Sequence, residues 1–344
     1  MNRVNNRLKQ MPGMIASGLM ILVTTLCTYW GVAEMYHEGW WGSLSNALPY
    51  LAPVAITLTP TLIAFRWPRI GGALLIALGM VAGWFFGNAG VVFISAVIAI
   101  VGAAFCFDGW IVSRNSGDHS PRWRGRARYR LAVGAPALVV IVISAIRLPA
   151  VLTRVDDGDR SARAIVTQGR TLIWAPAGPG WNWRQDWGGY PGWQSLALYG
   201  VDPVGLGEKP GYGRTVDSTR YATAADMIEH NLCLFLESDG LTLAAAPVHI
   251  WRMPTTAEVV GALVHHGDSA SCLWQGEFGR EVTCSTAPDK ESPLWATDVS
   301  VIYYWTADSY NDPRGYYVSF NGFVNAENKL GGNPRHGYRC VREP

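Results

Sequence analysis

Five long apolar segments occupy the first 150 residues and limit the folds open to this chain. The length of each segment is close to the about 20 residues that a helix needs to cross a hydrocarbon core about 30 Å thick. The segments contain almost no charged residues, which argues against their burial in a large soluble core. We therefore predict membrane spans at residues 14–36, 47–65, 70–86, 91–107 and 131–150.

The third and fourth of these segments are short and are joined only by residues 87–90. Two arrangements are open for them. They form either a tight helical hairpin that crosses the membrane twice or one re-entrant element.

The uneven distribution of basic residues predicts the orientation of the spans. Residues 1–153 carry 12 Lys/Arg and 4 Asp/Glu, whereas residues 154–344 carry 16 and 22. Loops 37–46 and 87–90 contain no Lys or Arg, and the basic residues gather in the alternate loops and before the first span. Because cytoplasmic loops are enriched in Lys and Arg, the N-terminus is predicted to be cytoplasmic and residues 154–344 to lie outside. A positive-inside loop accounts for the arginines between spans four and five, so we predict no nucleic-acid binding.

Cysteine usage agrees with an exported C-terminal part. Cys27 and Cys106 lie inside predicted spans. An even number of cysteines in an exported domain indicates two disulfides. Zinc is a weaker alternative, because the chain has no CxxC motif and no paired His at ligand spacing. The cysteines outside the spans are Cys233, Cys272, Cys284 and Cys340.

Short mixed elements follow the spans. Residues 154–163 are predicted to be a charged linker. The segment "AIVTQGRTLIWAP" predicts two strands joined by a turn at Gly169. Residues 178–221 are rich in glycine and aromatic residues and are predicted to be mostly loop. The Asn-Gly pair in "SFNGFV" predicts a β-hairpin near the end of the chain.

Two helices are predicted between these elements. Thr223 is placed to cap a helix that runs through Glu237. Thr255 and Glu258 have the spacing of a capping box, and the helix that they start is predicted to continue to about His265. Residues 164–344 are therefore predicted to form an α+β domain, C-terminal to an α-helical membrane domain.

Four ordered motifs of this domain resemble the Lcl C-terminal domain family, a widespread bacterial family. The motifs are "IWRMPTTAE", "YYWTADSY", "YYVSFNGFVNAENK" and "HGYRCVRE". The domain is more distantly similar to the formylglycine-generating (sulfatase-modifying factor) family, and both families resemble C-type-lectin-like folds. The resemblance covers about residues 165–343 and none of the spans. It implies an extracytoplasmic lectin-like domain attached to a bacterial cytoplasmic membrane, on its periplasmic or cell-surface side.

The resemblance also implies how the cysteines pair. It places the cysteine of the first helix with that of the last strand, which gives Cys233–Cys340 and leaves Cys272–Cys284 to close a local loop. Formylglycine-generating enzymes bind copper through a close cysteine pair near the end of the domain. This chain has only Cys340 in its last fifty residues. The chain therefore lacks the cysteine pair that binds copper in the enzymes.

Aromatic residues are the main candidates for a binding site, because the domain holds more of them than one small core needs. Tyrosine and tryptophan suit recognition because they combine contact area with a polar group. Some of these residues are predicted to form the core, and the rest to form a surface for a glycan, a peptide or a protein. The candidates are Trp181, Trp183, Trp187, Tyr190, Trp305, Tyr310, Tyr316 and Tyr317.

Asp308, Asn311 and Asp312 are the candidates for a metal site, since their oxygens could bind calcium. A turn is the commoner use of such residues. The sequence contains no GxSxG, P-loop or dinucleotide fingerprint, and no catalytic residue is predicted.

The resulting hypothesis is a non-catalytic, membrane-anchored, extracytoplasmic binding or interaction module. One alternative is an accessory subunit of a larger membrane complex, because five spans exceed what an anchor needs and could contact other membrane proteins as well as lipid. A second alternative is a formylglycine-generating-type oxidase.

Overall fold

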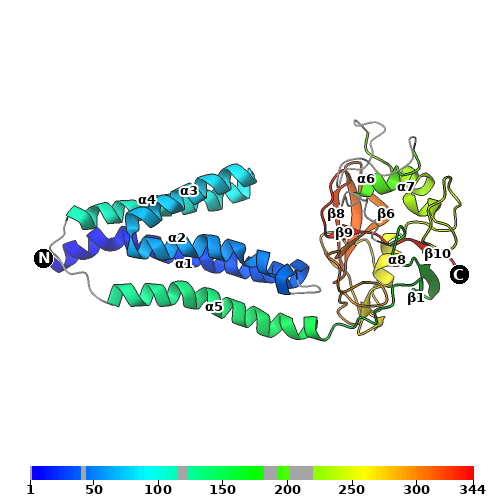
Figure 1. Cartoon of the computed structure of the whole chain (residues 1–344), viewed down its shortest axis with the longest axis horizontal. Helices are drawn as coiled ribbons and strands as arrows, with labels where there is room; N and C mark the ends of the chain where they lie inside the picture. Colours follow the sequence, from blue (N-terminus) through cyan, green and yellow to red (C-terminus); the bar gives the residue numbers. More distant parts are fainter. Residues whose placement is uncertain (1, 40–43, 88, 115–122, 182–191, 202–219) are drawn as a thin grey trace. The chain divides into compact units, whose positions relative to one another are not determined.

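The computed structural model describes residues 2–39, 44–87, 89–114, 123–181, 192–201 and 220–344. The chain divides into two compact units, unit 1 (Met1–Val151) and unit 2 (Leu152–Pro344). Unit 1 consists of long helices, and unit 2 combines short helices with β-sheets (Figure 1).

The described part of unit 1 contains five helices that are long and apolar enough to cross a membrane. The apolar stretches of these helices overlap all five predicted spans. Short π and 3-10 turns, η1 (Met35–Gly39), η2 (Leu44–Asn46) and η3 (Leu48–Leu51), lie between the first two helices. The helices are α1 (Asn2–Glu34), α2 (Ala52–Arg66), α3 (Pro68–Phe86), α4 (Ala89–Arg114) and α5 (Trp123–Leu152).

The third and fourth apolar segments form a helical hairpin, in which α3 and α4 lie side by side (Figure 1). Small residues bring the two backbones together. A Cβ atom added at Gly72 would lie 2.5 Å from the carbonyl oxygen of Gly102, and one added at Gly79 would lie 2.6 Å from that of Ser95. Such close approach is how helices associate where no hydrophobic effect drives them together.

Unit 2 is built around two larger sheets and one two-stranded ribbon among its described residues. The five-stranded sheet has the order β5-β8-β7-β6-β9, with β6 and β9 parallel and its other pairs antiparallel. Its strands are β5 (Arg280–Glu281), β6 (Tyr303–Asn311), β7 (Arg314–Ser319), β8 (Phe323–Asn328) and β9 (His336–Gly337). The three-stranded sheet consists of β1 (Arg163–Thr167), β2 (Arg170–Trp174) and β10 (Val341–Arg342), and the ribbon of β3 (Val264–His265) and β4 (Asp268–Ser269).

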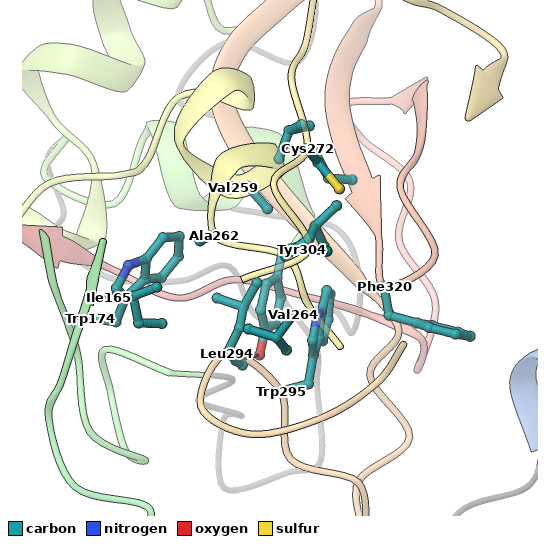
Figure 2. Packing of buried hydrophobic residues seen from close by; sticks show 14 of the residues in the cluster. Ile165, Trp174, Val259, Ala262, Val264, Cys272, Leu294, Trp295, Tyr304 and Phe320 are labelled. Carbon is teal, nitrogen blue, oxygen red and sulfur yellow. Dashed lines mark hydrogen bonds between the residues drawn. The ribbon is translucent and has the colours of Figure 1, made fainter. Parts of the chain in front are cut away.

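Two hydrophobic clusters pack on the five-stranded sheet. Side chains that alternate along a strand point to opposite faces, so neighbours such as Tyr304 and Trp305 belong to different clusters. In the first cluster, Trp174 from β2 and Val259 from α8 (Thr256–Gly261) converge with Tyr304 and with Trp295 of the preceding loop (Figure 2). The Trp295 and Tyr304 rings stack with centroids 3.8 Å apart.

Both predicted hairpins are confirmed, as β1–β2 and β7–β8. Of the predicted loop 178–221, residues 182–191 and 202–219 lie outside the described residues. The described remainder includes the short helix α6 (Trp193–Ala197).

The two predicted helices begin where expected but are shorter than predicted. Thr223 caps α7 (Ala224–Glu229), which ends at Glu229 and not at Glu237. Asn231 then caps a separate 3-10 turn, η4 (Leu232–Phe235), because its side chain accepts a hydrogen bond from the Cys233 amide.

The Thr255–Glu258 capping box is present at the start of α8. This helix ends at Gly261, before the predicted limit at His265. The residues that follow turn back as the β3–β4 ribbon, with Gly267 in a left-handed conformation (φ 83°).

Residues 154–163, predicted to be a linker, are hydrogen-bonded into unit 2. The Asp156 carboxylate accepts hydrogen bonds from both terminal nitrogens of Arg160, each at 2.8 Å, and from the Thr297 hydroxyl at 2.7 Å. Arg160 and Thr297 hold the pKa of Asp156 well below its usual range. Arg154 forms a 2.9 Å ion pair with Asp289. The segment is therefore part of the folded unit.

Three basic side chains are buried among the described residues of unit 2, and each donates to carbonyl groups: Arg339, Lys290 and Lys329, the last to the carbonyl of Ala222 at 2.6 Å. Arg339 is fully buried and donates to the carbonyls of Ala175 at 2.8 Å, Pro293 at 2.7 Å and Leu294 at 3.0 Å. Lys290 is also buried, and its ammonium donates to the carbonyl of Val299. Burial lowers the pKa of Lys290 from 10.5 to about 7, and the nearby charge of Arg154 contributes to the shift.

We expect the unfolding temperature of unit 2 to rise as the pH increases from about 7 to about 10.5, the interval between the folded and unfolded pKa values of Lys290. In this interval the unfolded chain keeps the lysine proton that the folded protein has lost, so stability increases with pH. Calorimetry of the full-length protein in detergent would measure this unfolding temperature. The transition of unit 2 is the one that shifts when the disulfides are reduced, because both disulfides lie in unit 2. Lys290→Met should show a smaller rise than the wild type, and equal slopes would contradict the assignment.

Candidate aromatic binding site

Four aromatic side chains form a partly exposed cluster on unit 2, which we call the aromatic platform: Trp274, Phe278, Tyr310 and Tyr316. Trp274 and Tyr316 are half-buried against the first hydrophobic cluster. The Phe278 and Tyr310 rings are stacked, with centroids 4.3 Å apart and an interplanar angle of 3°. Tyr316 meets Tyr310 edge-on at 5.5 Å, and Trp274 meets Tyr316 edge-on at 5.7 Å. Phe278 and Tyr310 remain 37% and 40% exposed. Stacked and edge-on pairs are the arrangements that aromatic rings prefer, so the rings hold one another in place.

The β6–β7 hairpin supplies two of these rings. Tyr310 lies near the end of β6, and Tyr316 lies on β7. The turn between the strands is fixed by the Asn311 side chain, which accepts a hydrogen bond of 3.0 Å from the Arg314 amide. The hairpin therefore carries both tyrosines, although the register of β6 against β7 shifts on either side of Ser309, next to Tyr310.

A loop closed by a disulfide supplies the other two rings. Cys272 and Cys284 are bonded, and between them the Leu273 amide donates to the Thr283 carbonyl at 3.0 Å. Gly276 and Gly279 have φ angles of 92° and 69°, which glycine adopts without strain. These features fold the short loop back on itself.

Hydrogen bonds fix the loop against the sheet. The Trp274 indole donates to the carbonyl of Glu277 at 3.1 Å, and the Glu277 carboxylate accepts from the Gln275 amide at 2.6 Å. The Gly279 amide donates to the carbonyl of Val324 on β8 at 2.8 Å. Because β8 is bonded to β7, the loop and the hairpin share one scaffold.

A carboxylate lies close to the platform. Burial raises the pKa of Tyr316, and Tyr310 and the negative charge of Asp308 raise it further. Asp308 itself accepts a hydrogen bond of 2.6 Å from the Thr256 amide. The site thus combines apolar ring surface with two phenol hydroxyls and an acidic oxygen pair.

Among the described residues, the structure places Tyr310 and Tyr316 of the predicted aromatic candidates in the platform. Trp181 and Trp305 are 4% and 0% exposed, so their assignment to a surface is corrected. Trp181 donates its indole proton to the Tyr304 hydroxyl at 2.7 Å and lies beneath Arg339.

Burial settles the predictions for Trp305 and Tyr317. The Trp305 ring stacks on that of His336 at 4.5 Å, and Tyr317 packs edge-on against Trp305 in the same cluster. Both are core residues. The remaining candidates, Trp183, Trp187 and Tyr190, lie outside the described residues.

Sequence reasoning missed Trp274 and Phe278. The available signal was their position between two cysteines twelve residues apart in "CLWQGEFGREVTC". A short disulfide-closed loop has little core of its own, so aromatic residues within it pack on a neighbouring element or on a ligand.

The residues considered for calcium have structural roles in the described part of the chain. Asp308 binds the Thr256 amide and Asn311 closes the hairpin turn. Asp312 is exposed in that same turn. Among the described residues, no group of three or more His, Cys, Asp or Glu side chains is placed to hold a metal ion.

The cysteines of unit 2 form two disulfides, Cys233–Cys340 and Cys272–Cys284. These are the pairs that the family resemblance implied. Cys27 and Cys106, in the helices of unit 1, are free thiols. With all four of its cysteines bonded, unit 2 does not offer the thiol pair that the copper site of a formylglycine-generating enzyme needs.

Comparisons with known proteins returned no match to this chain, whether to a family model, to a curated protein or to a solved structure. The resemblance to the Lcl C-terminal domain family therefore stays a prediction.

We expect the platform loop to lose its order when its disulfide is removed. The double substitution Cys272→Ala/Cys284→Ala removes a loop constraint worth on the order of 3 kcal/mol. Hydrogen exchange measured by mass spectrometry should then show faster exchange in residues 273–283, while the Cys233–Cys340 bond remains. Cys27→Ala is the control and should leave this exchange unchanged. Retained protection of the loop in the double variant would show that the disulfide does not order the platform.

Proposed function

We propose that the chain is a multi-pass bacterial membrane protein whose unit 2 lies outside the cytoplasm and binds carbohydrate on the aromatic platform. The five apolar helices support a membrane location. The two disulfides are compatible with an oxidising compartment, and the positive-inside pattern of the loops favours the same orientation.

The exposed, stacked Phe278–Tyr310 pair is the observation that carries the binding role. Exposed apolar rings that gather in one place on a folded domain support an interaction site there. Its rigidity matters as well, because a surface already ordered before binding loses less entropy when a ligand arrives.

The chemistry of the platform favours a saccharide. A sugar ring presents an apolar face of C–H groups and a rim of hydroxyl groups. The faces of Phe278 and Tyr310 suit the apolar face, while the Tyr310 and Tyr316 hydroxyls and the Asp308 carboxylate can accept hydrogen bonds from the rim.

We expect the full-length protein in detergent to retain glycans on an array, and Phe278→Ala and Tyr310→Ala to weaken that binding. Truncation of a central aromatic contact costs about 2 kcal/mol or more, which corresponds to about thirtyfold in affinity. Tyr310→Phe keeps the stacked ring and should retain most of the affinity. Isothermal titration with the best array ligand would give the values.

Ile228→Ala is the matched control, because Ile228 is 69% exposed on α7 and outside the platform. It should bind as the wild type does. The proposal fails if no glycan is retained, or if the two alanine variants of the platform bind as tightly as this control. Retention of a peptide in place of a glycan would transfer the site to peptide recognition.

A role as an accessory subunit is the second candidate, and the surface of α5 favours it. Helix α5 packs on the rest of unit 1 through residues such as Val140 and Ile143. Its residues Leu138, Ile141 and Ile146 are exposed. Such a face contacts either lipid or another membrane protein. Extraction in mild detergent with a fixed set of companion chains would favour this second role.

A further inference from the structure

An apolar groove runs between α2 and α3 in unit 1. Its volume is about 440 Å³. On α2 the lining follows one helical face, and on α3 it consists of two leucines one turn apart. The lining residues are Ala55, Ile56, Thr59, Pro60, Ile63, Leu74 and Leu78.

The groove is closed at one end by the turn between the two helices. Only Trp67 separates α2 from α3. Just beyond the turn the helices touch, because a Cβ atom added at Gly71 would lie 2.1 Å from the backbone nitrogen of Ala64. Further along α3, Leu74 and Leu78 line the groove, and Leu74 is exposed.

The groove and the helical turn beyond it together span about one leaflet of a membrane. The lining on α2 runs from Ala55 to Ile63, a rise of about 12 Å at 1.5 Å per residue, and Arg66 lies about 4.5 Å further along the helix. Half of a hydrocarbon core is about 15 Å. A chain that lies in the groove from the turn to its far end therefore reaches from the membrane surface to the midplane.

The closed end of the groove is positively charged. Arg66 is exposed at the end of α2, with its guanidinium 5.9 Å from the centre of the Trp67 ring. Arg69 follows in the first turn of α3. Trp67 is 55% exposed, as tryptophans at a membrane interface commonly are. Basic residues at the cytoplasmic end of an intramembrane groove attract anionic headgroups.

We propose that this groove binds one acyl chain of an anionic phospholipid, with the headgroup phosphate at Arg66. The inference rests on the membrane location proposed above. Charge complementarity selects the occupant, because the exposed Arg66 next to the groove suits an anionic headgroup. An acyl chain suits both the apolar lining and the narrow cross-section.

The test uses the full-length protein, stripped of lipid in detergent and examined by native mass spectrometry. Phosphatidylglycerol and phosphatidylcholine with identical acyl chains serve as the probes. Leu74→Trp fills the groove, and Arg66→Gln removes the charge at its end. Leu138→Trp is the matched control, since it adds the same ring to an exposed position of α5 outside the groove.

We expect the wild type to bind one phosphatidylglycerol more tightly than phosphatidylcholine. Arg66→Gln should reduce phosphatidylglycerol binding about fivefold and phosphatidylcholine binding less, because the choline ammonium already offsets the charge of that lipid's phosphate. Leu74→Trp should reduce the binding of both lipids, whereas Leu138→Trp should bind them as the wild type does.

Equal binding by Leu74→Trp and the wild type would overturn the groove as the site. Lack of preference for phosphatidylglycerol in the wild type would overturn the role of Arg66. The platform variant Phe278→Ala should bind both lipids normally, so failure of the lipid site and failure of the glycan site are distinguishable.

Discussion

The buried guanidinium of Arg339 holds together the segments on which the rest of unit 2 depends. It donates to carbonyls of the segment after β2, at Ala175, and of the loop at residues 293–294, and it lies 3.6 Å from the centre of the Trp181 ring. A cation inside a protein costs several kcal/mol unless hydrogen bonds offset its desolvation. Here Nε and Nη1 are bonded to carbonyls, whereas Nη2 is buried without a hydrogen-bond partner among the described residues. These segments must therefore meet at one place. The next residue, Cys340, adds the long-range disulfide to Cys233 at the same point.

This frame explains why an aromatic surface can form on so small a unit. The last strands and the first hairpin bury the large side chains of the core, which leaves β6 and β7 to extend beyond it. The platform rings lie at that extension, where the hairpin and the Cys272–Cys284 loop meet. Each ring is fixed by another ring or by a backbone bond, so the surface is ordered without a ligand. An ordered surface is what recognition at low entropic cost requires.

Features with local physical causes could be predicted from the sequence. The apolar segments, the capping box at Thr255 and the Asn-Gly hairpin all depend on neighbouring residues, and the structure contains them. Features with distant causes could not be predicted. Trp305 looked like a surface residue because its burial depends on His336 and Tyr317, which other strands bring to it. The platform was half predicted for the same reason, because the loop that carries Phe278 reaches Tyr310 only in the folded unit.

Trapping the cysteines in intact cells tests the central claim that unit 2 is an exported, disulfide-braced module. Cells are denatured in N-ethylmaleimide, which labels the free thiols. The disulfides are then reduced, and a heavier maleimide labels the released thiols before mass spectrometry. We expect the light label on the two free thiols of unit 1 and the heavy label on the four cysteines of unit 2. The light label on all six cysteines would place unit 2 in a reducing compartment and contradict the account.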